Sequence, residues 1–324
     1  MTKRGIKDYI LLVLKGIGMG AADVIPGVSG GTIAFITGIY EELIDSIKSV
    51  VAPESLKYLK SFSLLSYFKA INANFLLAVI GGIAISFLSL AKLMQYLLTN
   101  HPIFVWSFFF GLILASVWFV AKIIEKWNVS TYLFFITGII LGFAITTITP
   151  TETPNDLWFI FICGVVAICA MILPGISGSF ILLLMGKYIY MMSALSSFNF
   201  PIILVFLVGA AIGILAFSNF LSWLLHHFHA ATIAVLAGFM LGSLNKVWPW
   251  KVATQTFIDA QGIIRPLIEK NVLPSTYLIE NKAEPYLLGA IGFAILGAII
   301  IVLFERFFSK PVTKEVDLRE KLGL

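Results

Sequence analysis

Long apolar stretches with few charges recur along the whole chain. About twenty apolar residues cross the hydrocarbon core of a bilayer as a helix. Stretches of that kind predict membrane spans at residues 74–98, 103–121, 131–149, 201–225, 231–247 and 285–305. The stretches do not alternate apolar with polar positions, which argues against a membrane β-barrel. The pattern therefore predicts an all-α polytopic membrane protein.

Two further apolar regions, residues 9–46 and 157–190, are interrupted by helix breakers. The first carries ADVIPGVSGGT (residues 22–32) and the second carries LPGISGS (residues 173–179). Arms of about 17 residues on either side of a Pro-Gly pair are marginal for a full crossing. We predict that each region is a helical hairpin, broken at Pro26-Gly27 or Pro174-Gly175, that returns to its side of entry. The charge pattern leaves open whether the hairpins re-enter the membrane or are pairs of short full spans.

The two halves of the chain match each other in sequence. Gly38 corresponds to Gly186 at a spacing of 148 residues. Beyond them Gly82 corresponds to Gly209 at a spacing of 127 residues, because only the first half carries an amphipathic segment at residues 48–73. Such a segment, with lysines among its apolar residues, is typical of a membrane interface.

Each half contains one hairpin followed by three spans. Three crossings are an odd number, so residues 151–324 are predicted to lie upside down relative to residues 1–150. This arrangement is an inverted repeat, which is common among transporters, and it would bring the two hairpins together near the middle of the membrane.

Lysine and arginine support this topology. In this topology most lysines and arginines outside the spans lie on one side of the membrane. The loops at 99–102 and 150–156, on the other side, contain none. The positive-inside rule then places both termini in the cytoplasm. The external loop at 248–284 breaks the pattern with Lys251, Arg265, Lys270 and Lys282. Its length and mixed charge suggest a cap over the outer entrance.

The composition agrees with a membrane protein and narrows its partners. Of 324 residues, 59% are hydrophobic and 12% are charged, and the mean hydropathy is +0.98. The net charge of +5 is what cytoplasmic loops provide, so we expect no nucleic-acid partner. No buried cluster of histidine and acidic residues is present in the predicted spans, so neither a metal nor a cofactor is expected.

The segment after each break begins a new helix inside the membrane. The first amides of a helix lack partners and lie at the positive end of its dipole, which favours an anion. We expect a phosphate or carboxylate to bind at Ser29, Gly30, Gly31 and Thr32 of the first hairpin and at Ser177, Gly178 and Ser179 of the second. The alternative is close helix packing through small residues.

Charged residues in membrane segments are costly and often functional. Asp23 precedes the first break and is our candidate for proton or ion coupling, with Glu41 as a second; Asp23 could instead cap the broken helix. Lys15 and Lys187 lie in hairpin arms, where they either balance a bound anion or extend to the membrane surface. The polar pair Ser218-Asn219 falls in the middle of a span and is predicted to line a central cavity.

Both breaks also fit the pattern Gly-x-Ser-Gly, which marks the nucleophile of rhomboid-type intramembrane serine proteases. A serine nucleophile needs a base within hydrogen-bond reach. The histidines, His101, His226, His227 and His229, all lie at predicted span ends or in loops. The sequence therefore favours a carrier over an enzyme.

The paired motifs, together with Gly38-x-Tyr40 and Gly186-x-Tyr188, resemble the bacterial undecaprenyl-phosphate (polyprenyl-phosphate) translocases of the PopT type. The resemblance covers essentially the whole chain. It implies a multi-pass protein of the bacterial cytoplasmic membrane that returns undecaprenyl phosphate from the outer to the inner leaflet for cell-envelope polymer synthesis. The alternative is a carrier that uses the same site for a different substrate, namely another anion or phospholipid head group.

Overall fold

The computed structural model describes residues 4–24, 28–150, 153–258 and 264–308. Pro26 and Gly27, which the sequence analysis assigned to the first break, lie outside these ranges. The first half contains α1 (Ile6–Asp23), α2 (Gly30–Ile36), α3 (Tyr40–Ser49), α4 (Pro53–Lys60), α5 (Leu64–Ala70), α6 (Ala73–Asn100), α7 (Pro102–Ile123) and α8 (Val129–Thr147). The second contains α9 (Leu157–Ile172), α10 (Gly178–Leu184), α11 (Tyr188–Ser196), α12 (Phe200–His227), α13 (His229–Ser243), β1 (Lys251–Ile258), β2 (Ile264–Asn271), α14 (Pro274–Asn281) and α15 (Leu287–Phe308).

The protein is a mainly helical membrane protein, as its apolar pattern predicts. Within the described ranges, four helices are long and apolar enough to cross a bilayer, namely α6, α7, α8 and α12. Shorter apolar helices occur at Leu157–Ile172, His229–Ser243 and Leu287–Leu303. The span expected at 231–247 is shorter than predicted, because α13 ends at Ser243. The chain then turns toward Pro249, which has no amide hydrogen to continue a helix.

Corresponding helices of the two halves begin and end at corresponding residues. The helices α2 and α10 differ by 148 positions at both ends, and α6 and α12 differ by 127 at both ends. In each half the arm before the break packs along the long helix, α1 on α6 and α9 on α12. Glycines permit this approach: a Cβ added at Gly82 would lie 2.2 Å from the Val13 carbonyl oxygen, and one at Gly209 would lie 2.2 Å from that of Phe161.

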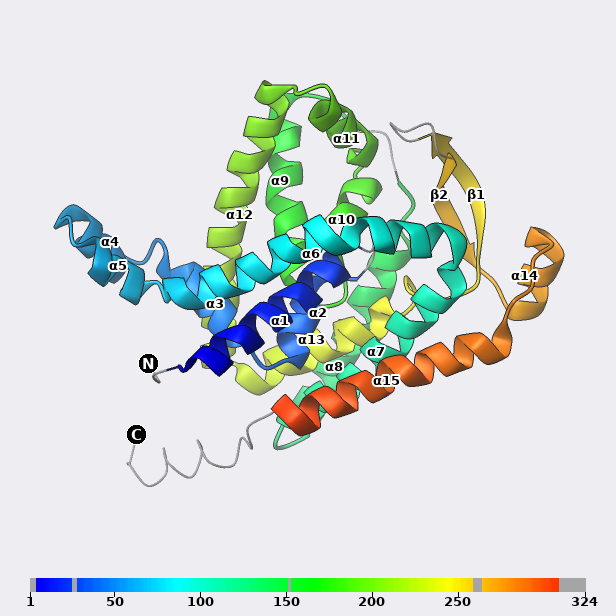
Figure 1. Ribbon diagram of the computed structural model, residues 1–324, viewed down its shortest axis with the longest axis horizontal. Coiled ribbons are helices and arrows are strands. Elements are labelled where there is room, and N and C mark those ends of the chain that lie inside the picture. The colour runs from blue at the N-terminus through cyan, green and yellow to red at the C-terminus, as the bar shows by residue number, and fades with distance from the viewer. Residues whose placement is uncertain (1–3, 25–27, 151–152, 259–263, 309–324) are drawn as a thin grey trace.

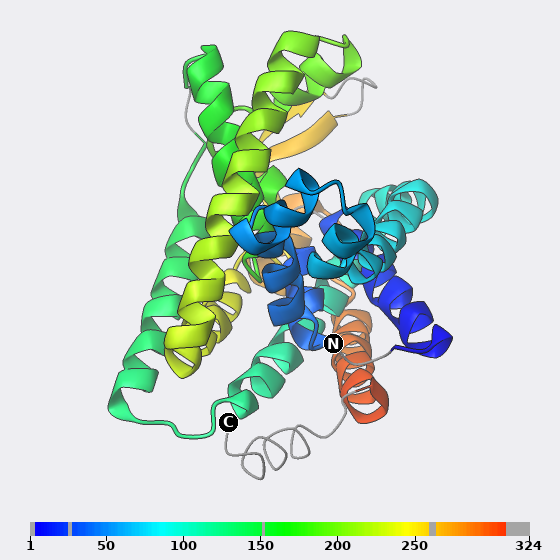
Figure 2. The same ribbon diagram turned by 90° about the vertical axis from the view of Figure 1, so that its left-hand side faces the viewer.

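The last two apolar helices of each half pack against helices of the other half. The helix α7 packs along α15, and α8 packs along α13, so each pair contains one helix from each half. Figure 2 shows α3 lying between α12 and the α1–α6 pair. Because α3 belongs to the first half and α12 to the second, their contact is a further link between the halves. The inverted orientation of the halves stays a prediction.

Each hairpin contains a second interruption that the sequence analysis did not foresee. The arm after the break was expected to be one helix, but it is divided into α2 and α3, and into α10 and α11. Gly38 and Gly186 lie at these points with φ of +69° and +64°, a left-handed conformation that glycine adopts without steric cost. As a result α11 turns by 112° from α10.

Two structures project from opposite sides of the helical body (Figure 1). On one side α4, α5 and the turn between them carry exposed apolar side chains, including Phe62, Leu65 and Phe68. On the other side lie α14 and an antiparallel hairpin of β1 and β2, in which Lys251 faces Asn271. The hairpin was not expected from the sequence, and it lies within the loop predicted to cap an entrance. The first turn of α1 and the last turn of α15 lie on the side away from it.

Candidate functional site

The two broken segments meet in the core of the protein. The Ser29 hydroxyl donates a hydrogen bond to the Met171 carbonyl oxygen at 2.8 Å. The Gly175 amide donates to the Thr32 hydroxyl at 2.9 Å. Because one partner in each bond belongs to the first half and the other to the second, the breaks hold each other in place. The structure thus places the first predicted binding motif directly against the second break.

The contact between the breaks leaves no room for a side chain. A Cβ on Gly31 would lie 2.4 Å from the Ile172 carbonyl oxygen. That oxygen also accepts a hydrogen bond from the Tyr40 hydroxyl at 3.2 Å. Gly175 has a φ of +103°, and a Cβ there would lie 2.6 Å from the Ser243 hydroxyl oxygen. Small residues are therefore required for packing at both breaks, which was the alternative to anion binding.

The N-terminus of α2 is already capped by a side chain, that of Asp23. The Gly30 amide donates to Asp23 Oδ1 at 2.6 Å. The Gly31 amide donates to the Ser29 hydroxyl at 3.0 Å, and the Thr32 amide donates to the Ser29 carbonyl oxygen at 2.9 Å. Asp23 therefore caps the broken helix, which was the alternative to a role in coupling. A role for Asp23 in coupling stays a prediction.

At the second break, Ser177 caps α10 by accepting a hydrogen bond from the Phe180 amide at 3.3 Å. Its hydroxyl lies 3.1 Å from that of Ser179. A Cβ on Gly178 would lie 2.7 Å from the Ala167 carbonyl oxygen, so this glycine packs against α9. Ser179, in contrast, lines an open pocket.

The two lysines of the hairpin arms bind backbone and loop oxygens. Lys15 Nζ donates to the Thr37 carbonyl oxygen at 2.7 Å, at the negative end of α2. Lys187 is 3% exposed, and its Nζ donates to the Thr153 carbonyl oxygen at 2.6 Å and to Asn155 Oδ1 at 2.8 Å. In this conformation neither lysine contacts the Ser-Gly motifs, so their part in binding an anion stays a prediction.

The remaining predicted residues lie around α12 and its junction with α13. Glu41 Oε1 lies 2.9 Å from His229 Nε2, which joins α3 to the start of α13. Ser218 is fully buried, and its hydroxyl has no hydrogen-bond partner among the described residues. Its neighbour Asn219 is exposed and donates to the Leu215 carbonyl oxygen at 2.8 Å. The pair therefore does not line one common surface.

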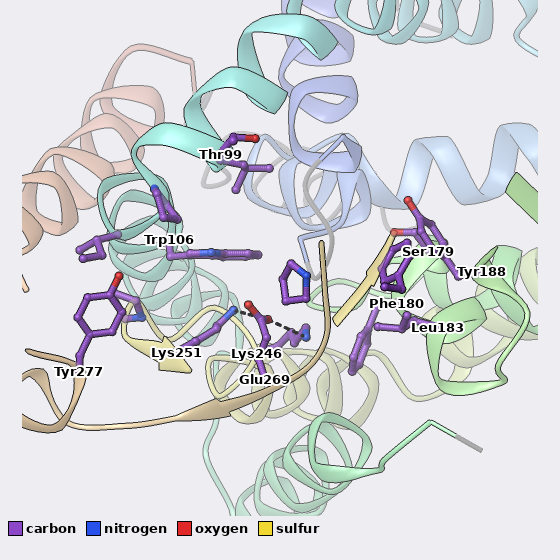
Figure 3. A pocket seen from close by; sticks show the side chains of 16 residues that line it. Thr99, Trp106, Ser179, Phe180, Leu183, Tyr188, Lys246, Lys251, Glu269 and Tyr277 are labelled. Carbon is purple, nitrogen blue, oxygen red and sulfur yellow. Dashed lines mark ion pairs between the residues drawn. The ribbon is translucent and has the colours of Figure 1, made fainter. Parts of the chain in front are cut away.

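A cavity of about 390 Å³ lies between the second break, α7 and the β1–β2 hairpin (Figure 3). Three charged side chains meet in it. Lys246 Nζ and Lys251 Nζ lie 3.8 Å and 3.6 Å from the same atom, Glu269 Oε2. Lys251 Nζ also lies 3.7 Å from the centre of the Trp106 ring, within the range of a cation–π interaction.

Burial changes the ionisation of this lysine pair. It lowers the pKa of Lys251 to about 8, against a partly opposing effect of Glu269. The pKa of Lys246 is also lowered by burial. The sequence analysis missed both lysines, Glu269 and Trp106 as site residues. The available signal was Lys251 itself, one of the four basic residues with which the 248–284 loop breaks the positive-inside pattern.

Comparisons with known proteins agree with one another. A family model described as undecaprenyl phosphate translocase-like matches residues 19–265. A polyprenyl-phosphate transporter of Vibrio cholerae is 45% identical over 305 residues, which are 94% of this chain and 98% of the relative. A polyprenyl-phosphate transporter of Staphylococcus aureus is 35% identical over 272 residues, which are 76% of this chain and 91% of the relative. No solved structure matches the chain. The match of the family model over most of the chain, together with these two relatives, means that the chain belongs to the undecaprenyl phosphate translocase-like family.

Proposed function

We propose that this protein transports a polyprenyl phosphate and moves it from the outer to the inner leaflet of the bacterial cytoplasmic membrane. The observation that carries the proposal is the junction of the two broken hairpins, where Ser29 and Thr32 bind the backbone of residues 171 and 175. Paired helix breaks at the interface of two repeats are where transporters of this architecture hold their substrates. The names of the two relatives support the choice of substrate.

In the proposed mechanism the phosphate binds to the amides and hydroxyls of the two breaks. The Gly30 amide becomes available when Asp23 releases it, and Ser179 already faces a cavity. The polyprenyl chain stays in the lipid. One half then rocks against the other and exposes the phosphate to each leaflet in turn, which requires the hydrogen bonds between the breaks to open and re-form.

Charge makes inward movement costly. A phosphate monoester carries about −1.5 to −2 charges at pH 7. Moving it toward a negative interior costs about 2.3 kcal/mol per charge per 100 mV. A proton that moves with the lipid offsets this cost, and Asp23 is the proposed carrier because its carboxylate holds the amide that the phosphate needs. Protonation would weaken that hydrogen bond and free the amide.

The variant Asp23→Asn separates coupling from capping. Its side-chain oxygen still accepts from the Gly30 amide, but the residue cannot take up a proton. We expect residual transport that no longer responds to an imposed pH gradient. Asp23→Ala also loses the cap, and its free energy of unfolding should be ~1 kcal/mol lower than that of Asp23→Asn. The measurement is transport into proteoliposomes with and without a gradient; wild-type gradient dependence in Asp23→Asn would refute the coupling.

The proposed function is tested with purified protein in proteoliposomes and labelled undecaprenyl phosphate. Wild-type protein should move the lipid between leaflets, and the double variant with Ser29→Ala and Ser177→Ala should be nearly inactive. Ser196→Ala is the matched control, because its exposed hydroxyl donates within its own helix, to the Met192 carbonyl oxygen. If wild-type protein moves no polyprenyl phosphate under a pH gradient and a membrane potential, but does move inorganic phosphate or phosphatidylglycerol, the second candidate, a carrier for another anion or phospholipid, replaces the first.

A further inference from the structure

The cavity beneath the β1–β2 hairpin contains an ammonium group without an acceptor. The Lys251 side chain is 5% exposed, and its Nζ has no hydrogen-bond partner among the described residues. The nearest carboxylate oxygen, Glu269 Oε2, is 3.6 Å away, beyond ordinary hydrogen-bond length. Burying a charged group without hydrogen bonds is costly. The cavity is therefore built to receive a further negatively charged acceptor.

The charges around Lys251 indicate which anion fits. Lys246 and Lys251 contribute two positive charges and Glu269 one negative charge, so the group has a net charge of +1. A phosphate monoester carries about −1.5 to −2 charges and three acceptor oxygens. In the place of Glu269 it would neutralise both lysines. A phosphodiester, as in ordinary phospholipids, carries one charge and would give no gain over the carboxylate already present.

From this geometry we propose that the cavity is a receiving site for the phosphate monoester head group of a lipid, in which the phosphate replaces the Glu269 carboxylate between Lys246 and Lys251. This inference rests on the proposed function for the choice of a lipid rather than free phosphate. The site shares Ser179 with the second Ser-Gly motif, but its charged residues lie outside both motifs, between the second break and the β1–β2 hairpin.

The rest of the lining suits the first part of a prenyl chain. Hydroxyls of Thr99, Ser179 and Tyr188 border the cavity, and Figure 3 shows Ser179 and Tyr188 across it from Trp106. Apolar side chains complete the wall, among them Ile103, Phe180, Leu183 and Phe257. A mostly apolar pocket with a few charged groups is the usual form of a site for such a ligand. Since Ser179 belongs to the first turn of α10, the site leads directly to the break.

Glu269 also connects ligand entry to the hairpin. It lies on β2, whereas Lys251 lies at the start of β1 and Lys246 precedes it. Its side chain is 22% exposed, so it has space to move outward. When phosphate takes its place, β2 loses its ion pairs with both lysines. Binding would thereby loosen the strand that covers the cavity.

The experiment measures equilibrium binding of radiolabelled farnesyl phosphate, a short prenyl monoester, to the full-length protein in nanodiscs. Lys251→Met and Lys246→Met should each weaken binding by about tenfold or more, because a charged hydrogen-bond partner is lost. Glu269→Gln should strengthen binding several-fold, because the competing carboxylate is gone. Lys270→Met is the matched control, since this exposed lysine is the next residue on β2, and it should bind as wild type does.

Competition identifies the source of the phosphate. Unlabelled farnesyl phosphate should displace the probe at far lower concentration than inorganic phosphate, and phosphatidylglycerol should displace little. Equal competition by inorganic phosphate would overturn the assignment to a lipid. Unchanged binding in both methionine variants, or weaker binding in Glu269→Gln, would overturn the site. A merely structural role of the lysines would not strengthen binding in Glu269→Gln, so this variant tests the site even where a methionine variant folds poorly.

The transport assay keeps this result separate from the proposed function. Transport by wild-type protein combined with normal binding in the lysine variants would reject the receiving site and leave the function standing. Binding that follows the expected pattern, without any transport of polyprenyl phosphate, would reject the function and leave a monoester site.

The pH dependence of binding follows from Lys251. Its pKa in the free protein is about 8, and a bound phosphate would raise it. Binding is therefore strongest between about pH 6, above which the phosphate is doubly charged, and pH 8. Above pH 8 each complex must take up a proton. Affinity for farnesyl phosphate should fall by about tenfold per pH unit between the free and bound pKa values. A binding curve that is flat from pH 7 to pH 10 in wild-type protein would contradict this.

Discussion

Gly31→Ala is expected to abolish transport of polyprenyl phosphate. The new Cβ would lie 2.4 Å from the Ile172 carbonyl oxygen. The backbone fixes the position of the Cβ, and the carbonyl oxygen belongs to the main chain, so rotating a side chain cannot relieve the clash. The α2 segment would be pushed away from the second break. The bonds from Ser29 to residue 171 and from residue 175 to Thr32 would then lengthen or break. Overpacking of this kind costs ~1–3 kcal/mol of stability, while the loss of transport should be nearly complete.

The matched control for this variant is Gly81→Ala. Gly81 lies in α6, and no atom lies within 4 Å of a Cβ placed there. This variant should transport as wild type does and gain up to ~1 kcal/mol, since alanine favours a helix over glycine. Both variants are compared in the proteoliposome assay and by thermal unfolding in detergent. Wild-type transport by Gly31→Ala would mean that the contact between the breaks is not needed for the transport cycle.

The second large effect is expected for Gly111→Ala, in the pair formed by α7 and α15. A Cβ at position 111 would meet the main chain of Ala294 at its carbonyl oxygen, far inside van der Waals distance. The two helices cannot approach each other with any side chain at this position, so we expect most of the protein to be lost as aggregate. The measurement is the monodisperse fraction in size-exclusion chromatography, together with the melting temperature.

Gly292→Ala provides the comparison for Gly111→Ala. It changes a glycine of α15 that has no atom within 4 Å of an added Cβ. We expect wild-type yield and melting temperature from this variant. If Gly111→Ala behaved in the same way, the close packing of α7 on α15 would be wrong.

Sequence alone predicted the helical elements because the signals for them are local. Apolar length marked the spans, and the two repeat spacings of 148 and 127 residues recur in the bounds of α2 and α10 and of α6 and α12. The interruptions at Gly38 and Gly186 were missed, although both glycines were recognised as repeat markers. An isolated glycine in an apolar segment is compatible with a continuous helix, so its left-handed φ was not foreseeable.

The candidate site was predicted in part, for a related reason. The motifs at residues 29–32 and 173–179 were each visible as a run, and the repeat argument placed them together, where the structure has them in contact. The lysine pocket depends on residues from α7, α10 and the β1–β2 hairpin. No short stretch contains Trp106, Lys251 and Glu269, so only the tertiary fold reveals them as neighbours. The backbone partners of Lys15 and Lys187 were hidden in the same way.

The exchange of partners between the halves has a consequence for how the chain is made. While the ribosome is still adding residues, α7 and α8 enter the membrane before α13 and α15 exist. Both must therefore wait in the lipid, exposing the glycine faces along which their partners later pack. The α7–α15 pair closes only when the last helix has been synthesised. A nascent chain that stops after residue 150 would thus hold inserted but unpaired helices, which makes it a substrate for membrane chaperones and proteases rather than a functional half.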